Sequence, residues 1–247
     1  MRKVKLTLEY DGTRYAGWQI QKNAETIQRE VEEALESVLS EKVRVYGAGR
    51  TDAGVHALGQ VAHFETRSQL PLKNIRDGAN TYLPPDIVIL RAEEVDLSFH
   101  ARYNAREKIY LYRVLLRDVR SPLELHRACH IAVPLDVEEM QRGAGYFVGH
   151  HDFSAFTASG SSVKSKVRTI SRLDIERKAE LLKFEFQADG FLYKMVRNIV
   201  GTLLEVGKGK LSAYKIEEIL KSGERKLAGP TAPASGLYFL RILYGDN

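Results

Sequence analysis

The chain has 247 residues, 44% of them hydrophobic and 28% charged, which is typical of a soluble globular protein with one large core or two smaller ones. It has no apolar run near the roughly 20 residues that a membrane-spanning helix requires, which excludes a membrane protein. Its single cysteine, Cys129, excludes an internal disulfide, and the basic opening residues lead into alternating sequence instead of an export signal. We therefore expect a cytoplasmic protein.

Positive charge is concentrated in the second part of the chain. Residues 1–100 carry 13 basic and 15 acidic side chains, a net charge of −2, whereas residues 101–247 carry 24 and 17, a net charge of +7. The basic clusters there and the tyrosines among them are Arg102, Arg106 and Lys108; Lys164, Lys166 and Arg168; Lys208 and Lys210; and Tyr103, Tyr110, Tyr112 and Tyr193. Cations for phosphates beside aromatic rings for bases favour an RNA partner, although each single cluster is also typical of solvated surface.

Hydrophobic periodicity predicts the order β-α-β-β-α-β in the first part of the chain. The predicted elements are a strand over 4–10, a helix over 27–39 with Thr26 as its cap, strands over 42–46 and 60–65, a helix over 72–83 and a strand over 87–95. The turn Asp11-Gly12 ends the first strand, and Pro84-Pro85 stops the second helix.

The second part repeats this order and adds helices. Its predicted elements are a strand over 108–116, a helix over 137–147 with Asp136 and Glu139 as a capping box, strands over 167–175 and 181–186, helices over 192–204 and 212–220, and a strand over 237–242. The pattern is that of ferredoxin-like domains. We predict an α+β fold of two ferredoxin-like (RRM-like) domains, residues 1–103 and 104–247, with a cleft between their sheets.

The most unusual segment is the glycine-rich loop Gly47-Ala48-Gly49-Arg50-Thr51-Asp52-Ala53-Gly54-Val55-His56-Ala57. Its three glycines allow close backbone approach and left-handed turns, which would hold Arg50, Thr51 and Asp52 in one tight loop. A carboxylate presented there can reach a substrate. As a nucleophile Asp52 must stay ionised, which a nearby cation such as Arg50 favours and burial opposes. The residues alone leave a second role open, in which Asp52 caps the turn with its own side chain.

Other nucleotide and metal motifs are incomplete. Gly47-Ala48-Gly49 lacks the third glycine of a dinucleotide loop, and Gly207-Lys208-Gly209-Lys210 lacks the spacing of a P-loop, so NTP hydrolysis has no support. His126, Cys129 and His130 have no second ligand pair nearby, and we assign no metal. The segment His150-His151-Asp152-Phe153 is expected to form a solvated turn.

Around the glycine-rich loop the sequence resembles the TruA family of tRNA pseudouridine synthases. The match covers nearly the whole chain, with its segments in family order. Those segments are Leu8-Glu9-Tyr10-Asp11-Gly12-Thr13, Tyr15-Ala16-Gly17-Trp18-Gln19, Gly49 to Ala57, Phe99-His100-Ala101-Arg102, Lys108 to Tyr112, His151-Asp152-Phe153 with Phe156, Val167 to Ile170, Phe191 to Ile199, and Ala232 to Leu237.

The resemblance implies conversion of uridine to pseudouridine at tRNA nucleotides 38, 39 and 40, in the anticodon stem-loop, by a homodimer without a cofactor. It also implies that the two ferredoxin-like domains join in a continuous, mainly antiparallel sheet with a central RNA-binding cleft.

By the same resemblance, Asp52 is the catalytic residue, which either adds to the base or assists loss of uracil from the sugar. Tyr110 stacks on the uracil and helps remove the C5 proton, although the residue alone is equally typical of a buried strand tyrosine. Arg197 pairs with the aspartate and keeps it anionic, where a helix-surface arginine is the simpler role. Arg50 helps turn the target base out of its stack.

Two other functions remain open from the residues. A non-catalytic RNA-binding protein with two RRM-like domains would share the fold and the charge distribution, although no RNP1-like run occurs. A nucleic-acid glycosidase or nuclease would also use an exposed carboxylate, but it would release uracil or cut strands.

Overall fold

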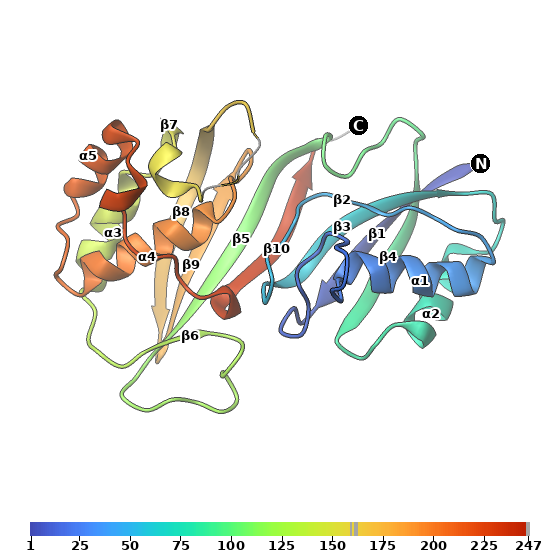
Figure 1. Cartoon of the computed structure of the whole chain (residues 1–247), viewed down its shortest axis with the longest axis horizontal. Helices are drawn as coiled ribbons and strands as arrows, with labels where there is room; N and C mark the ends of the chain where they lie inside the picture. The colour runs from blue at the N-terminus through green and yellow to red at the C-terminus, as the bar shows by residue number, and fades with distance from the viewer. Residues whose placement is uncertain (159, 161–162, 246–247) are drawn as a thin grey trace. The chain divides into compact units, whose positions relative to one another are not determined.

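The computed structural model describes residues 1–158, 160 and 163–245, which form two units (Figure 1). Unit 1 comprises Met1–Arg106 together with the chain from Tyr238 onward, and unit 2 comprises Glu107–Leu237. In the described part of the chain, no helix is both long enough and apolar enough to cross a membrane.

Unit 1 is built on a mainly antiparallel sheet. Its elements are β1 (Arg2–Tyr10), α1 (Ile27–Leu39), β2 (Tyr46–Gly47), β3 (His56–Thr66), α2 (Leu72–Tyr82), β4 (Ile87–Val95) and most of β10 (Leu237–Tyr244). The strand β1 pairs antiparallel with β4 on one side and with β3 on the other, and β2 and β10 pair with the far edge of β3. Because β3 lies between β1 and β2, the first β-α-β is split by a third strand.

One face of this sheet forms the main core of unit 1. Val4, Leu6 and Leu8 of β1 are fully buried and alternate along the strand, opposite Phe64, Ala62 and Gln60 of β3. The helices α1 and α2 contact each other, and the buried face of α1 presents Ile27, Val31 and Leu35 at four-residue spacing. Full burial of each such side chain stabilises the fold by roughly 1.5–3 kcal/mol.

The opposite face of the sheet carries a smaller cluster. Ala48, Val61 and Ala101 are buried there beneath Phe99, Ile242 and Tyr244. The Tyr244 hydroxyl donates to the Ala101 carbonyl oxygen at 2.8 Å, which ties β10 to the chain segment that leaves β4. The polar side chains of Lys3 and His63 are also buried on this face.

One prediction for unit 1 is wrong, and a second is confirmed in position only. The predicted strand over 42–46 is reduced to the two residues of β2, because side chains of α1 bond the Val45 backbone: its N–H donates to Glu32 Oε1 at 2.9 Å and its carbonyl accepts from Gln28 Nε2 at 3.1 Å. Thr26 stands at the N-cap position of α1, but its hydroxyl is buried without a hydrogen-bond partner in the described part of the chain. Only the backbone carbonyl of Thr26 takes part in the first turn of α1.

Unit 2 also combines α-helices with mainly antiparallel β-strands. Its elements are most of β5 (Ala105–Leu116), β6 (Cys129–Ile131), α3 (Val137–Gly145), β7 (Gly149–Asp152), β8 (Val167–Lys178), β9 (Leu181–Ala188), α4 (Met195–Gly207), α5 (Lys215–Ser222) and 3-10 turns at Ser154–Phe156, Arg225–Leu227 and Ala234–Gly236. The strands follow the order β5-β9-β8-β7, all antiparallel, while β6 runs parallel to β5. The expectation of helices with mainly antiparallel strands is thus confirmed within each unit.

The structure corrects three details of unit 2. The predicted turn over 150–153 is mostly strand, because β7 pairs with β8. The capping box of α3 is half formed: Asp136 Oδ1 accepts from the Glu139 N–H at 2.9 Å, but the Glu139 carboxylate accepts from the Ala213 N–H instead of returning to the cap. The helix predicted from 192 begins at Met195, because Lys194 has the left-handed φ of +60°.

A buried histidine in unit 1 makes stability depend on pH. The His63 ring stacks on Tyr46, and its Nδ1 accepts from the Ala101 N–H at 3.2 Å. Burial, with the charges of His100 and Lys3, lowers the pKa of His63 to about 4, whereas an unfolded histidine titrates near 6.5.

Between pH 6.5 and 4 the unfolded chain therefore binds a proton that the folded chain does not, and the free energy of unfolding falls as the pH falls. We expect this residue to contribute a loss of about 2 kcal/mol over that window. Urea unfolding at pH 7 and pH 4.5 should show a smaller decrease for His63→Gln than for the native chain. An equal decrease in both proteins would contradict the assignment.

Candidate active site

The glycine-rich loop connects β2 to β3 in unit 1. Thr51 is 7% exposed, whereas Arg50 on one side of it is exposed and Asp52 on the other is partly exposed. The structure thus brings Arg50 and Asp52 to the surface in one loop. For Arg50, no carboxylate partner occurs within residues 1–158, 160 and 163–245.

A buried polar network holds this loop against the strands β1 and β3. The Tyr10 hydroxyl lies 2.9 Å from Thr51 Oγ1, and Gln60 Nε2 donates to the Gly49 carbonyl oxygen at 2.9 Å and to Tyr10 at 3.4 Å. Burial raises the pKa of Tyr10 to about 12, so its hydroxyl keeps its proton at neutral pH. Because backbone and side-chain atoms next to Asp52 are bonded to β1 and β3, the carboxylate is presented by a rigid support.

A second segment, residues 11–18, packs against the loop along its length. The Trp18 N–H donates to the Thr51 carbonyl oxygen at 3.0 Å, and the Gly54 N–H donates to the Tyr15 carbonyl oxygen at 3.3 Å. These two bonds flank Asp52 on both sides in sequence. The loop is therefore fixed by its neighbour as well as by the sheet.

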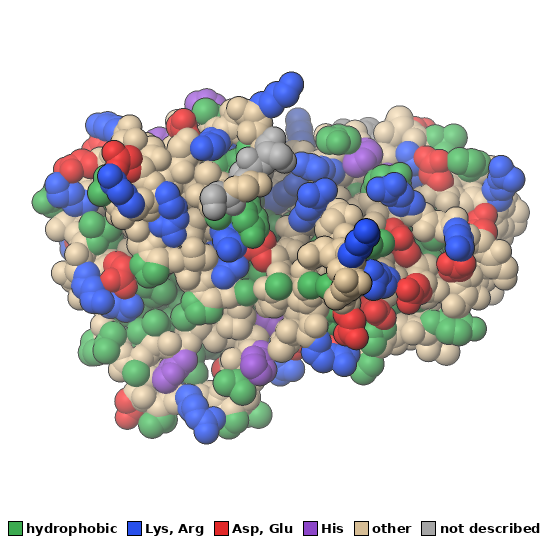
Figure 2. Space-filling view, in the orientation of Figure 1, with side chains coloured by type: hydrophobic (Ala, Val, Ile, Leu, Met, Phe, Trp, Pro, Cys, Tyr) green, Lys and Arg blue, Asp and Glu red, His purple; other side chains and the backbone are tan. Residues whose placement is uncertain are grey.

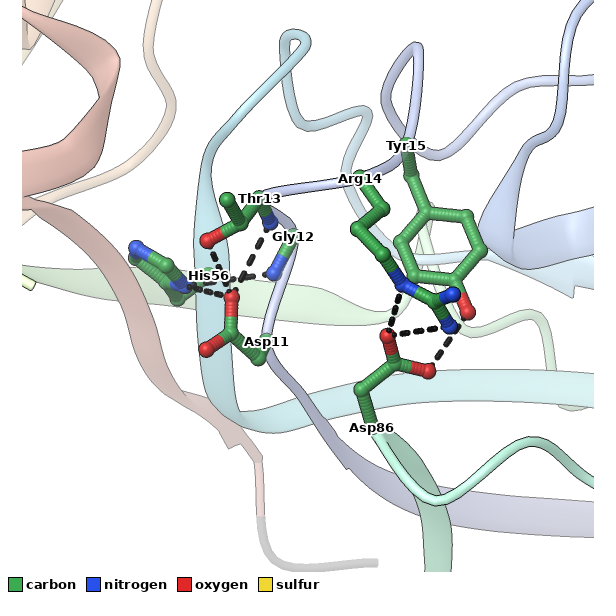
Figure 3. A network of polar contacts seen from close by, with 7 residues as sticks. All are labelled: Asp11, Gly12, Thr13, Arg14, Tyr15, His56 and Asp86. Atoms are coloured by element: carbon green, nitrogen blue, oxygen red, sulfur yellow. Dashed lines mark hydrogen bonds and ion pairs between the residues drawn. The ribbon is translucent and has the colours of Figure 1, made fainter. Parts of the chain in front are cut away.

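Figure 3 shows how residues 11–15 are themselves held. Asp11 Oδ1 accepts from the Thr13 N–H at 3.0 Å, and the Gly12 N–H donates to His56 Nδ1 at 3.1 Å. A Cβ at Gly12 would lie 2.0 Å from the Val55 carbonyl oxygen, so only glycine fits this close approach. The turn after β1 is thereby docked on the first residues of β3.

The same figure shows Asp86, just before β4, as the anchor of the other end of this segment (Figure 3). Its carboxylate accepts from Arg14 Nε at 2.8 Å and from the Tyr15 hydroxyl at 2.6 Å. Burial and the contact with Asp86 raise the pKa of Tyr15. Both loops near Asp52 are thus tied to the sheet of unit 1.

Sequence reasoning found the loop but assigned no role to this scaffold. Gly17 and Trp18 appeared only as parts of matching segments, Tyr10 also as the end of a predicted strand, and Gln60 only as a strand residue. Their functional signal was an unusual density of aromatic residues and glycines within residues 10–18. Such a density marks close backbone packing without naming its partner.

Two predicted residues lie in unit 2. Tyr110 is on β5, opposite Phe186 of β9, and is 7% exposed. Its ring meets that of Phe191 edge to face, with centroids 5.0 Å apart. Tyr110 is thus a largely buried strand tyrosine in unit 2, and its stacking role stays a prediction.

Arg197 lies in the first turn of α4 and is partly buried. Its Nε donates to the Ala232 carbonyl oxygen at 2.7 Å, and the Ala232 N–H donates back to the Arg197 carbonyl oxygen at 3.0 Å. The adjacent Asn198 accepts from Arg225 at 3.0 Å and from Thr231 at 2.6 Å. Arg197 is therefore bonded to Ala232 through both its side chain and its backbone, and its pairing with the aspartate stays a prediction.

The predicted site residues supply a carboxylate, a tyrosine hydroxyl and arginine guanidinium groups. In the described part of the chain, no three His, Cys, Asp or Glu side chains form a group that could hold a metal ion. Figure 2 shows Lys and Arg side chains over the visible face of each unit. Lys164 and Lys166 of the predicted basic cluster are exposed, and Arg168 is partly exposed.

Comparison with known sequences identifies one family. A family model described as tRNA pseudouridine synthase matches residues 7–104 and 144–245. The protein named tRNA pseudouridine synthase A of Acetivibrio thermocellus is 54% identical over 244 residues, which covers 99% of this chain and 100% of the relative. A protein of the same name from Thermoanaerobacter pseudethanolicus is 49% identical, with the same coverage. Since the match spans the glycine-rich loop and both units, this chain belongs to the tRNA pseudouridine synthase family.

Proposed function

We propose that the chain converts uridine to pseudouridine at nucleotides 38, 39 and 40 of the tRNA anticodon stem-loop, with Asp52 as the catalytic nucleophile. Membership of the family makes the chain an isomerase of uridine in tRNA. The observation that carries the assignment of Asp52 is its place in a surface loop whose backbone is bonded on both sides, at Thr51 and at Gly54. A preorganised carboxylate of this kind is what nucleophilic catalysis requires.

The reaction needs only one such carboxylate. The bond from uracil N1 to ribose C1′ breaks, the base turns, and a bond from C5 to C1′ replaces it. The proton that leaves C5 is balanced by the proton that N1 gains, so the product is an isomer and no electrons are exchanged. Unlike a glycoside hydrolase, which activates water with a second group, the enzyme uses the detached base itself as the incoming nucleophile. Asp52 either adds to the base or assists departure of uracil from the sugar.

The other predicted residues fit supporting roles. Arg50, exposed and without a carboxylate partner in the described residues, would help displace the target base from its stack. Tyr110 would stack on the uracil and assist removal of the C5 proton. Arg197, which is positioned by Ala232, would pair with the aspartate and keep it ionised.

The proposal includes the architecture and the assembly. We infer two ferredoxin-like domains, divided near residue 104, that share a continuous sheet and an RNA-binding cleft. The split β-α-β of unit 1, and the position of β9 between β5 and β8 in unit 2, support this assignment. The working enzyme would be a cytoplasmic homodimer that needs no cofactor.

The specificity can be tested with anticodon stem-loop RNAs that carry a tritium label at C5 of one uridine. We expect the native chain to release tritium from RNAs labelled at position 38, 39 or 40, with the uracil still attached to the RNA. A uridine at position 32 on the opposite side of the loop is the matched control and should release none. Release of free uracil would indicate a glycosidase, and equal release from position 32 would refute the assigned specificity.

A further inference from the structure

A cluster of aromatic rings lies on the face of the unit 1 sheet that the helices leave open. His63 of β3 alternates with the core residues Ala62 and Phe64, so its side chain lies on the opposite face from them. Its ring centroid is 5.3 Å from that of Tyr46 and 4.6 Å from that of His100.

The cluster extends to the surface at two tyrosines. The His100 ring lies 6.0 Å from Tyr46 and 4.2 Å from Tyr103, which places the two tyrosine centroids within about 10 Å of each other. Tyr46 is 44% exposed and Tyr103 is 76% exposed. The Tyr46 ring therefore packs against the buried His63, and the Tyr103 ring packs against His100, which in turn contacts His63.

An arginine guanidinium group lies against the ring of each tyrosine. The guanidinium carbon of Arg44 lies 5.5 Å from the centroid of Tyr46, and that of Arg102 lies 5.9 Å from the centroid of Tyr103. Contacts of this kind orient a guanidinium group and reduce the rotamer freedom that it would lose on binding. The chain thus presents two oriented guanidinium groups on one surface.

These two charges are not neutralised locally. Within the residues that the structure describes, neither Arg44 nor Arg102 forms an ion pair, although both are exposed. The lysines of the same sheet face differ in this respect, because Lys3 pairs with Glu65 and Lys5 pairs with Glu93.

The local field is positive as well. Burial is the main cause of a lowered pKa at His100, and the charges of Lys3 and Arg102 lower it further. The His100 Nδ1 accepts from the Arg102 N–H at 3.2 Å, so the ring stays close to the guanidinium-bearing residue. The charges of Lys3 and Arg102 therefore act on this surface, and Glu65, the carboxylate that acts on the neighbouring His63, is itself paired with Lys3.

We propose that Arg44, Tyr46, His100, Arg102 and Tyr103, which we call the Arg44–Tyr103 surface, bind the phosphate backbone of the tRNA as a contact additional to the Asp52 loop. The planar guanidinium fork matches the oxygens of a phosphate and binds them bidentately. The proposal depends on tRNA being the substrate, which the family establishes, and does not depend on the role of Asp52.

The test compares Arg44→Gln, Arg102→Gln and the double variant with Lys73→Gln. Lys73 is the matched control because it removes the same charge from α2, in the helical layer of unit 1. Equilibrium binding of unmodified tRNA is measured over a range of KCl concentrations, together with kcat and KM. Gel filtration reports the oligomeric state of every variant.

We expect each single arginine variant to raise the Kd about three- to tenfold and to lower the slope of log Kd against log salt by roughly 0.7–0.9, the value for one phosphate contact. The value of kcat at saturating tRNA should stay within about twofold, with the loss confined to KM. A Kd and slope equal to those of Lys73→Gln would overturn the proposal. A weaker affinity with an unchanged slope would assign the surface to bases instead of phosphates, and a changed oligomeric state would assign it to a protein interface.

Discussion

Substitution of Asp52 by Asn is expected to abolish isomerisation while leaving tRNA binding within about twofold of the native value. Asn has the shape of Asp without its charge, and the contacts that hold the loop are made by Thr51, Gly49 and the backbone, so the fold should persist. Loss of a nucleophile costs at least roughly 10³-fold in turnover. Single-turnover release of tritium from C5-labelled tRNA measures the chemical step, and filter binding measures the affinity.

The control for this substitution is Asp77→Asn on α2, which removes an equal charge from a carboxylate that is also partly exposed. Lys73 and Arg76 lower the pKa of Asp77, so its loss should slightly reduce stability without affecting turnover. If purified Asp52→Asn retained turnover within tenfold of the native chain, another group would have to be the nucleophile. If it lost binding and turnover together, Asp52 would be a structural residue of the loop.

The predicted elements match the structure where residues close in sequence determine their ends. The helix over 27–39 and the strand over 87–95 are confirmed residue for residue, because local signals bound them: Ser40 adopts the left-handed φ of +53° after α1, and Pro84-Pro85 precedes β4. The strand over 42–46 is wrong because its backbone partners are side chains of α1, which no local pattern reveals.

At the candidate site, too, residues within one segment predicted close packing, whereas contacts between segments distant in sequence could not be predicted. The glycines of the Asp52 loop predicted close packing, and the structure places Thr51 against Tyr10, a residue 41 positions away in sequence. That pairing could not be derived from either segment alone, since it depends on the register of β1 against β3. The roles of Tyr110, Arg197 and Arg50 stay predictions, which the structure describes by position and contacts only.

The scaffold around Asp52 leads to a second strong prediction, at Gly17. This residue has a φ of +101°, a conformation that side-chain-bearing residues rarely adopt, and a Cβ there would lie 2.4 Å from the Thr51 carbonyl oxygen. That oxygen accepts the hydrogen bond from the Trp18 N–H, so any displacement breaks the contact that holds the loop beside Asp52. We expect Gly17→Ala to reduce the free energy of unfolding by about 3 kcal/mol and turnover by at least roughly tenfold.

The matched control is Gly145→Ala at the end of α3, where an added Cβ would meet no atom within 4 Å and where no left-handed φ is required. Since alanine favours a helix over glycine, this variant should equal or slightly exceed the native stability. Urea unfolding and single-turnover kinetics of both variants separate the two effects. If Gly17→Ala had the same stability and turnover as Gly145→Ala, the close approach of residues 17 and 51 would not be what positions Asp52. If Gly17→Ala lost turnover at temperatures where it stays folded, the geometry of that contact would be a direct requirement of the reaction.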